Sequence, residues 1–253
     1  STKIVPTAEY NPFECIKTNI HGAMNLIEVA LDNKISTVVA LSTDKACNPV
    51  NLYGATKLAS DKLFIAGNLH SDNYLTKFSV VRYGNVIGSR GSVIPFFLDL
   101  KNKGSIPITD INMTRFMITV GQAVKLVLHA IEDSIGGETY VHKIPSMKIV
   151  DIAKTISPKS EQKIIGVRPG EKIHEIMISL EDALNTYEYE WYYKILPNLN
   201  QWNIDKNRIK SGQKVDNNFV YSSETNSDWM DPKDLLEIIN SDDYLELNDF
   251  NSL

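Results

Sequence analysis

Cysteine is scarce in this chain of 253 residues, which has only Cys15 and Cys47. They lie 32 positions apart with no CxxC or histidine spacing, so they indicate neither a zinc site nor a disulfide scaffold. No apolar run approaches the roughly 18 residues of a membrane helix, and residues 1–6 lack the layout of a signal peptide. We therefore expect a protein of a reducing compartment, the cytoplasm, without a membrane partner or a bound metal.

An excess of positive charge is also absent, since 26 Lys and Arg face 31 Asp and Glu for a net charge of -5. Residues 224–253 alone hold nine acidic residues and one basic residue, which leaves the remainder at +3. A mildly positive body accepts an anionic small molecule but lacks the dense basic surface of a nucleic-acid binder. We expect no nucleic-acid partner and a solvated acidic tail over 240–253.

The first third of the chain alternates helix and strand signals. Apolar residues at helical spacing predict a helix from about Pro12, with Asn11 as its cap, to Asn33. A second helix is predicted over 52–68, and short apolar runs predict buried strands over 37–42 and 78–83. This order predicts an α/β fold with a parallel sheet over residues 1–94.

After residue 94 the regular alternation of helix and strand signals is lost, and a smaller α+β region is predicted over 95–239. Its predicted helices are 95–102, 120–133, 149–156 and 173–179, with a short last helix after Asp231. Its predicted strands are 106–108, 139–141 and 163–167. The Tyr-, Asn- and Lys-rich stretch 188–231 has weak periodicity and is predicted to be an irregular arm.

The densest group of chemically useful residues is Ser42-Thr43-Asp44-Lys45-Ala46, at the end of the first predicted strand. Ligands of open parallel sheets bind outside the carboxyl ends of strands, so a charged pair there faces a crevice. Asp44 can act as an acid or a base, and Lys45 as a base if its surroundings lower its pKa. Taken alone, the pentapeptide is equally compatible with a helix cap followed by a surface lysine.

Tyr53 and Lys57 follow at a spacing that puts both on one face of a helix. A phenol is a poor base at neutral pH, but a cation one turn away stabilises the phenolate and lowers its pKa. A hydroxyl-oxidising enzyme needs such a base. The spacing alone occurs often by chance, and its position eight residues after Lys45 makes it more specific.

A glycine-rich stretch, Arg82 to Val93, follows the second predicted strand. Its three glycines allow close approach of the backbone to a ligand, and Arg90 can meet a phosphate. On its own the stretch is equally compatible with a plain turn.

Together these motifs resemble the extended short-chain dehydrogenase/reductases that act on nucleotide sugars. The segments LSTDKACNPVNLYGATKLASDKLF, VVRYGNVIGSRGSVIPFF, ITDINMTRFMIT, KIPSMKIVDIAK and IIGVRPGEKIHEIMIS closely resemble the inverting UDP-N-acetylglucosamine 4,6-dehydratases. Those enzymes make the first intermediate of pseudaminic acid and related sugars. The similarity covers roughly residues 3 to 239.

The resemblance implies catalytic roles for four residues. Tyr53 would remove the proton of the sugar C4 hydroxyl, and Lys57 would bind the nicotinamide ribose of NADP and tune Tyr53. Lys45 would abstract the C5 proton and Asp44 would protonate the departing C6 hydroxyl. Retaining dehydratases place Asp-Glu where Asp44-Lys45 stand, so the lysine discriminates between the two classes.

The resemblance also implies the binding residues, with UDP-N-acetylglucosamine as the partner of a homo-oligomer. Besides Tyr53 and Lys57, the positions that match cofactor contacts are Lys3, Val86, Ile87, Gly88, Ser89 and Arg90. The positions that match contacts with the UDP-sugar are Asn85, Val93, Thr109 and Arg168. Arg168 suits a clamp on the diphosphate or uridine.

One feature departs from this family, because no glycine-rich dinucleotide-binding turn precedes Tyr53. We therefore expect this chain to be a fragment or a shortened gene product, whose residues 1–94 form the C-terminal part of the family's Rossmann-like parallel sheet. On its own it should bind NADP poorly and be poorly soluble or oligomeric. Two alternatives stay open, namely an epimerase of the same superfamily, which would not need Lys45, and an inactive UDP-sugar-binding fragment.

Overall fold

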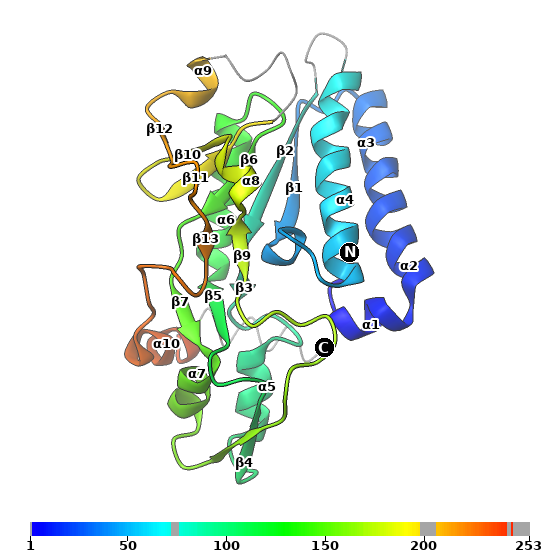
Figure 1. Cartoon of the computed structure of the whole chain (residues 1–253). Helices are drawn as coiled ribbons and strands as arrows, with labels where there is room; N and C mark the ends of the chain where they lie inside the picture. The colour runs from blue at the N-terminus through cyan, green and yellow to red at the C-terminus, as the bar shows by residue number, and fades with distance from the viewer. Residues whose placement is uncertain (1, 72–75, 198–205, 242–243, 245–253) are drawn as a thin grey trace. The chain divides into compact units, whose positions relative to one another are not determined.

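The computed structural model describes residues 2–71, 76–197, 206–241 and 244 (Figure 1). Contacts group the chain into two compact units. Unit 1 comprises Ser1–Tyr83, Gly121–Lys143 and Ile176–Tyr221, and unit 2 comprises Gly84–Val120, Ile144–Glu175 and Ser222–Leu253. The units alternate along the chain, whereas the sequence predicts contiguous regions over 1–94 and 95–239. Except for residues 240, 241 and 244, the predicted acidic tail lies outside the described residues.

The sheet of unit 1 has six strands in the order β1-β2-β6-β11-β10-β12. Their bounds are β1 Thr37–Thr43, β2 Lys77–Tyr83, β6 Thr139–His142, β10 Thr186–Glu188, β11 Tyr192–Ile195 and β12 Gln213–Lys214. β1, β2 and β6 are parallel, and β11, β10 and β12 extend the sheet with antiparallel pairings. This confirms the predicted α/β fold with a Rossmann-like parallel sheet.

Helices cover both faces of this sheet. α3 (Gly22–Asp32) and α4 (Leu52–Gly67) pack beside each other in Figure 1, and their apolar residues share a core with Val80 of β2. The next residue of β2, Val81, packs instead with α6 (Val120–Asp133). Since successive strand residues point to opposite faces, α6 covers the face opposite α3 and α4.

The first predicted helix is continuous but not uniform. It consists of α2 (Pro12–Ile16), a π-helical turn (Lys17–His21) and α3, and it follows the short α1 (Val5–Tyr10). Asn11 occupies the cap position, yet its side chain donates to the Thr7 carbonyl instead of capping the helix. Among its apolar residues at helical spacing, Ile27 is buried but Met24 is exposed.

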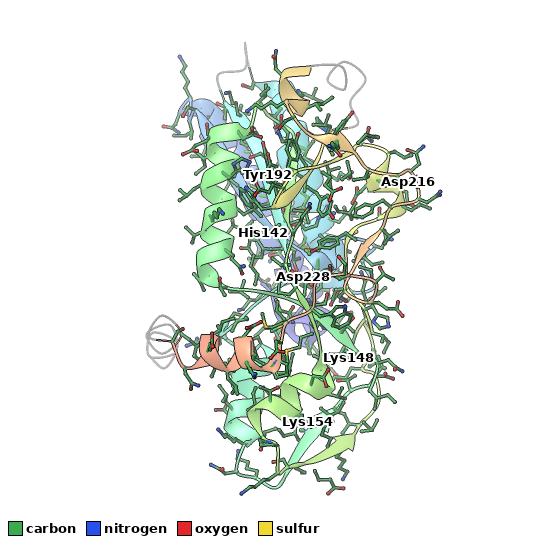
Figure 2. All side chains as sticks on the ribbon, turned by 90° about the vertical axis from the view of Figure 1, so that its left-hand side faces the viewer. His142, Lys148, Lys154, Tyr192, Asp216 and Asp228 are labelled. Atoms are coloured by element: carbon green, nitrogen blue, oxygen red, sulfur yellow. The ribbon has the colours of Figure 1, made fainter. Side chains whose placement is uncertain are left out.

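Two predictions for the later part of unit 1 are wrong. The stretch 188–231, predicted to be an irregular arm, contains strand β11, which pairs antiparallel with β10 and with β6, where Tyr192 lies opposite His142 (Figure 2). Residues 198–205 of this stretch lie outside the described residues. The segment predicted as a helix over 173–179 contains strand β9 (Ile176–Ile178), followed by α8 (Leu180–Ala183). Three consecutive apolar residues in β9 fit a buried strand as well as a helix, so periodicity alone could not decide.

A cluster of ion pairs lies at the end of α6, in which Lys194 is buried and Lys210 is exposed. Asp133 Oδ2 lies 2.5 Å from Lys194 Nζ of β11, and its Oδ1 lies 2.5 Å from Lys210 Nζ, which follows α9 (Lys206–Ile209). The Tyr140 hydroxyl donates to the same carboxylate at 2.8 Å. Burial raises the pKa of Asp133, but these three hydrogen bonds outweigh it and lower the pKa to about 2.

Asp133→Asn is expected to lower the free energy of unfolding by about 3–5 kcal/mol, because it leaves the Lys194 ammonium buried without its counterion. The pKa of Asp133 falls from 3.8 to about 2 on folding, so its contribution is complete above pH 4 and is lost as the pH falls through about 2. Urea unfolding at neutral and acid pH measures this. The exposed neighbour variant Glu132→Gln should change little, and an equal loss for both variants would contradict the assignment.

Unit 2 combines short strands with helices that pack on a common core. Its strands are β3 Asn85–Val86, β4 Ser105–Ile108, β5 Thr114–Ile118, β7 Ser146–Lys148 and β8 Glu161–Ile164, and its helices are α5 Val93–Leu100, α7 Ile149–Ile156 and α10 Pro232–Ile239. β5 lies between β3 and β7, while β4 pairs parallel with β8. Leu235 and Ile239 of α10 join the core formed with Phe97 and Ile152. Lys154 of α7 and Lys148 at the end of β7 are labelled in Figure 2.

No helix in the part of the chain that the structure describes is both long enough and apolar enough to span a membrane.

Candidate active site

The residues predicted to carry chemistry at the end of β1 form a tight turn. β1 runs to Thr43, and Asp44–Ala46 make one turn of 3-10 helix, capped by the Thr43 hydroxyl at 3.3 Å from the Lys45 backbone nitrogen. Asp44 is fully buried, and its Oδ1 accepts hydrogen bonds from Lys45 Nζ at 3.0 Å and Thr43 Oγ1 at 2.9 Å. Lys45 keeps 24% of its side chain exposed. The turn therefore holds a carboxylate and an ammonium in direct contact, with the ammonium reaching solvent.

Tyr53 stands in the first turn of α4. Asn51 caps this helix by accepting a hydrogen bond from the Gly54 backbone nitrogen at 2.8 Å. The Tyr53 ring packs against Ala8 and Cys15, and its hydroxyl is hydrogen-bonded to the Thr43 side chain. Thr43 thus touches both Asp44 and Tyr53, and the three predicted residues Asp44, Lys45 and Tyr53 form one cluster.

The protonation of Tyr53 differs from the sequence-based expectation. Burial raises the pKa of Tyr53, and the Thr43 hydrogen bond and the Lys45 charge offset this only in part. The sequence predicts a pKa lowered by Lys57, and that prediction is wrong for this structure. Lys57 lies one turn further along α4 and donates to the Leu41 carbonyl at 2.7 Å.

Gly54 lets α4 approach the turn of Asp44 and Lys45. A Cβ at this position would lie 2.2 Å from the Lys45 carbonyl oxygen and 3.0 Å from Pro49 Cβ. Real Cβ atoms do not approach a backbone oxygen this closely, so a side chain here would push the turn away from the helix.

Gly54→Ala is expected to lower the free energy of unfolding by about 1–3 kcal/mol, as overpacking does. Chemical denaturation compares it with Gly121→Ala on α6, where nothing lies within 4 Å of the added Cβ. The Gly121 variant should be neutral or slightly more stable, because alanine favours a helix. Equal stability of the two variants would show that the approach of α4 to the turn is not tight.

Four further residues extend this cluster, and none of them has an individual role in the sequence-based predictions. Ser42 Oγ donates to Asp61 Oδ2 at 2.5 Å, and Arg82 Nη1 donates to Asp182 Oδ2 at 2.9 Å. All of them belong to unit 1. Asp61 lies four residues after Lys57 on the same helix, and this spacing was the one signal in the sequence that could have indicated it.

Lys3, predicted to contact a cofactor, is exposed and precedes α1. Its neighbour Thr2 exchanges two hydrogen bonds with the Asn19 side chain, which also donates to Thr56 Oγ1 at 3.0 Å. Thr56 lies on α4 between Tyr53 and Lys57, so the chain at Lys3 is tied to the helix that carries both.

The other predicted binding residues belong to unit 2. The stretch 86–90 leaves β3 through a turn in which the Ser89 backbone nitrogen donates to the Val86 carbonyl at 3.1 Å. Gly88 adopts φ 83°, a left-handed conformation that glycine accepts without strain. Ile87 is buried, Arg90 is exposed, and Asn85 and Val93 are half-buried at the starts of β3 and α5.

Thr109 and Arg168 follow the paired strands β4 and β8. Thr109 is half-buried and Arg168 is exposed. Arg115 holds the segment after Arg168, because its guanidinium donates to the carbonyls of Lys172 at 2.9 Å and Ile173 at 3.0 Å. Asn85, Val93, Thr109 and Arg168 are therefore all parts of unit 2, while Asp44, Lys45, Tyr53 and Lys57 are parts of unit 1.

The part of the chain that the structure describes holds no group of three His, Cys, Asp or Glu side chains placed to bind a metal ion. Both cysteines are buried, and neither forms a disulfide.

Comparison with known proteins identifies the family. The model of the polysaccharide biosynthesis protein family matches residues 1–197. An inverting UDP-N-acetylglucosamine 4,6-dehydratase from Campylobacter jejuni is 56% identical over 246 residues, which cover 94% of this chain and 73% of that protein. A UDP-glucose 4-epimerase from Rickettsia canadensis is 39% identical, over 84% of this chain and 64% of its own length.

Among solved structures, Pen from Bacillus thuringiensis superposes with a TM-score of 0.83 at 32% identity, over 98% of this chain and 73% of that one. Sequence and structure agree on the same relationship. The chain belongs to the polysaccharide biosynthesis protein family, on the branch that includes the inverting UDP-N-acetylglucosamine 4,6-dehydratases.

Proposed function

We propose that this chain carries the catalytic residues of an NADP-dependent UDP-N-acetylglucosamine 4,6-dehydratase that inverts C5. The observation that supports this most is the pair Asp44 and Lys45, whose side chains touch at 3.0 Å beside Tyr53. An epimerase at C4 needs the tyrosine and Lys57 but has no use for a second acid–base pair. The 56% identity to a dehydratase of this specificity, against 39% to an epimerase, points the same way.

Tyr53 opens the proposed reaction as the base for the C4 hydroxyl. Its raised pKa keeps the phenol protonated in the structure described here. A base must lose that proton first, and Thr43 and Lys45 are the two groups that lower the pKa of Tyr53. We propose that they stabilise the phenolate when the sugar hydroxyl is in place.

Asp44 and Lys45 carry out the proposed elimination of water. Transfer of the shared proton from Lys45 Nζ to Asp44 Oδ1 converts the pair into a neutral amine and a neutral acid. The amine can then take the C5 proton, which the C4 ketone acidifies, while Asp44 gives its proton to the departing C6 hydroxyl. Reduction at C6 leaves an enolate, and a proton from solvent then adds to the opposite face of its C5 and inverts that centre.

The residues around Lys57 fit a nicotinamide dinucleotide. An ammonium has three N–H donors, and one of those of Lys57 is used by the Leu41 carbonyl at 2.7 Å. The others can bind ribose hydroxyls, with Lys3 and residues 86–90 as the further proposed contacts. The bound nicotinamide supplies the hydride acceptor for oxidation at C4 and the hydride donor for reduction at C6. Asn85, Val93, Thr109 and Arg168 are proposed to hold the UDP-sugar.

We further propose that the product enters the synthesis of pseudaminic acid or a related sugar in the cytoplasm. The two cysteines form no disulfide, which is compatible with a reducing compartment. We also propose that the chain assembles into a homo-oligomer.

Proton NMR of the enzyme with UDP-N-acetylglucosamine and NADP in deuterated water tests the proposal. A dehydratase yields a 4-keto sugar with a new C6 methyl group, an inverted C5 and solvent deuterium at C5. An epimerase would instead yield a sugar that keeps its C6 hydroxymethyl group and inverts C4. Binding of the UDP-sugar without any turnover would support the non-catalytic alternative, and both of these results would overturn the proposal.

A further inference from the structure

Two side chains of α4 hold two consecutive residues of β1. Lys57 Nζ donates to the Leu41 carbonyl at 2.7 Å, and the Ser42 hydroxyl donates to Asp61 Oδ2 at 2.5 Å. Lys57 and Asp61 are one helical turn apart, so α4 is hydrogen-bonded to β1 at two consecutive residues, Leu41 and Ser42. The strand continues directly from Ser42 into Thr43, Asp44 and Lys45.

Asp61 is buried among charges. It is 2% exposed, and its second oxygen, Oδ1, has no hydrogen-bond partner among the described residues. Burial raises the pKa of Asp61, and three cations oppose this effect and favour the carboxylate. The strongest of them is Arg82 of β2, which stands in register with Ser42, ahead of Lys57 and Lys62. Arg82 is itself fixed by the Met177 carbonyl at 2.7 Å and by Asp182 at 2.9 Å.

We propose that Asp61 is a positioning residue for Lys57, whose ammonium it balances with negative charge while it ties α4 to the end of β1. The proposal rests on the proposed function for the roles of Tyr53 and Lys57. In it, Asp61 touches neither substrate nor cofactor and acts through Lys57 and Ser42.

The electrostatics of the helix agree with this geometry. Burial lowers the pKa of Lys57, and Asp61 is the charged group that opposes this effect. Without a carboxylate at position 61, the ammonium would be easier to deprotonate and would bind ribose hydroxyls less well. A purely structural clamp would stabilise the fold but would leave the titration of Lys57 unchanged.

Asp61→Asn keeps the shape of the side chain and removes its charge. Carbon NMR of labelled lysine, with the Lys57 signal assigned by its absence in Lys57→Arg, should show a lower pKa of Lys57 than in the unsubstituted protein. Asp61→Glu should restore most of the shift, and the control Asp32→Asn on the exposed side of α3 should show none. An unchanged Lys57 titration in Asp61→Asn overturns the proposal, and this readout needs no enzymatic activity.

Kinetics provide a second readout, which depends on the proposed function. In Asp61→Asn, kcat should fall by about tenfold or more while KM for the UDP-sugar changes by less than about threefold. A change confined to the KM for the UDP-sugar would overturn the assignment to Lys57. Absence of turnover in the unsubstituted protein would count against the proposed function alone, because the NMR result stands separately.

If Asp61→Asn does not fold, Ser42→Ala tests the proposed role of Asp61 instead. It keeps the carboxyl group but removes the hydrogen bond that stabilises the anion. The pKa of Lys57 should then shift in the same direction by a smaller amount. A folded Ser42→Ala protein with an unshifted Lys57 would overturn the proposal.

Discussion

Tyr53→Phe is expected to slow oxidation at C4 by about 10²–10⁴-fold, the usual contribution of a positioned general base. The ring is retained, so its packing against Ala8 and Cys15 should persist, and only the hydroxyl that meets Thr43 is lost. Stopped-flow absorbance of the reduced nicotinamide measures this step directly.

The pH dependence of the same step provides a further check. Because the pKa of Tyr53 is raised, the rate of oxidation should rise with pH through the neutral range as the phenolate forms. Tyr53→Phe should lose this dependence. The matched control is Tyr10→Phe, since Tyr10 is 86% exposed on α1. A Tyr53→Phe enzyme that oxidises C4 at the normal rate would assign the base to another group.

Lys45→Ala is expected to reduce dehydration by about 10²–10⁴-fold while oxidation at C4 continues. The reason is the order of the steps, because the C5 proton becomes acidic only after the C4 ketone has formed. Reduced nicotinamide should therefore accumulate in a single turnover, and no C6 methyl signal should follow.

Lys62→Ala is the control for Lys45→Ala, since Lys62 is an exposed lysine on α4. It should leave both steps within about twofold of the unsubstituted enzyme. Unchanged overall turnover in Lys45→Ala would refute its role as the base at C5. Loss of oxidation and dehydration together would instead indicate that Lys45 acts mainly on Tyr53.

Local signals were sufficient to predict the elements around the candidate site. The apolar run over 37–42 predicted β1, and Ile149–Ile156 was predicted with its observed bounds. The predicted burial of β1 is wrong, because β1 is the edge strand of its sheet and Leu41 is 52% exposed. β10 and β11 were missed because strands of three and four residues are too short for a clear alternation. Their tyrosines are typical of strands, but they become recognisable only through pairing with β6.

The chemistry of the site was harder to predict than its position. The raised pKa of Tyr53 depends on burial against Ala8 and Cys15, residues that lie 38 or more positions away in the sequence. Asp61 was overlooked for a similar reason, because Ser42 and Arg82 approach it from two different strands. Spacing along one helix shows which side chains share a face but not what that face meets.

The alternation of the two units has a consequence for how the chain acquires its structure. Unit 1 contains residues from both the first and the last third of the sequence, and β11 can join β6 only after most of the chain has been made. Contacts between such distant residues form slowly because long loops must close first. Neither unit can therefore be expressed as one uninterrupted segment, and a ribosome-bound chain ending before β11 lacks the antiparallel half of its sheet. During that interval Tyr140 lacks its contact with Tyr192 and β6 has an unpaired edge, and such transiently exposed surface is prone to aggregation.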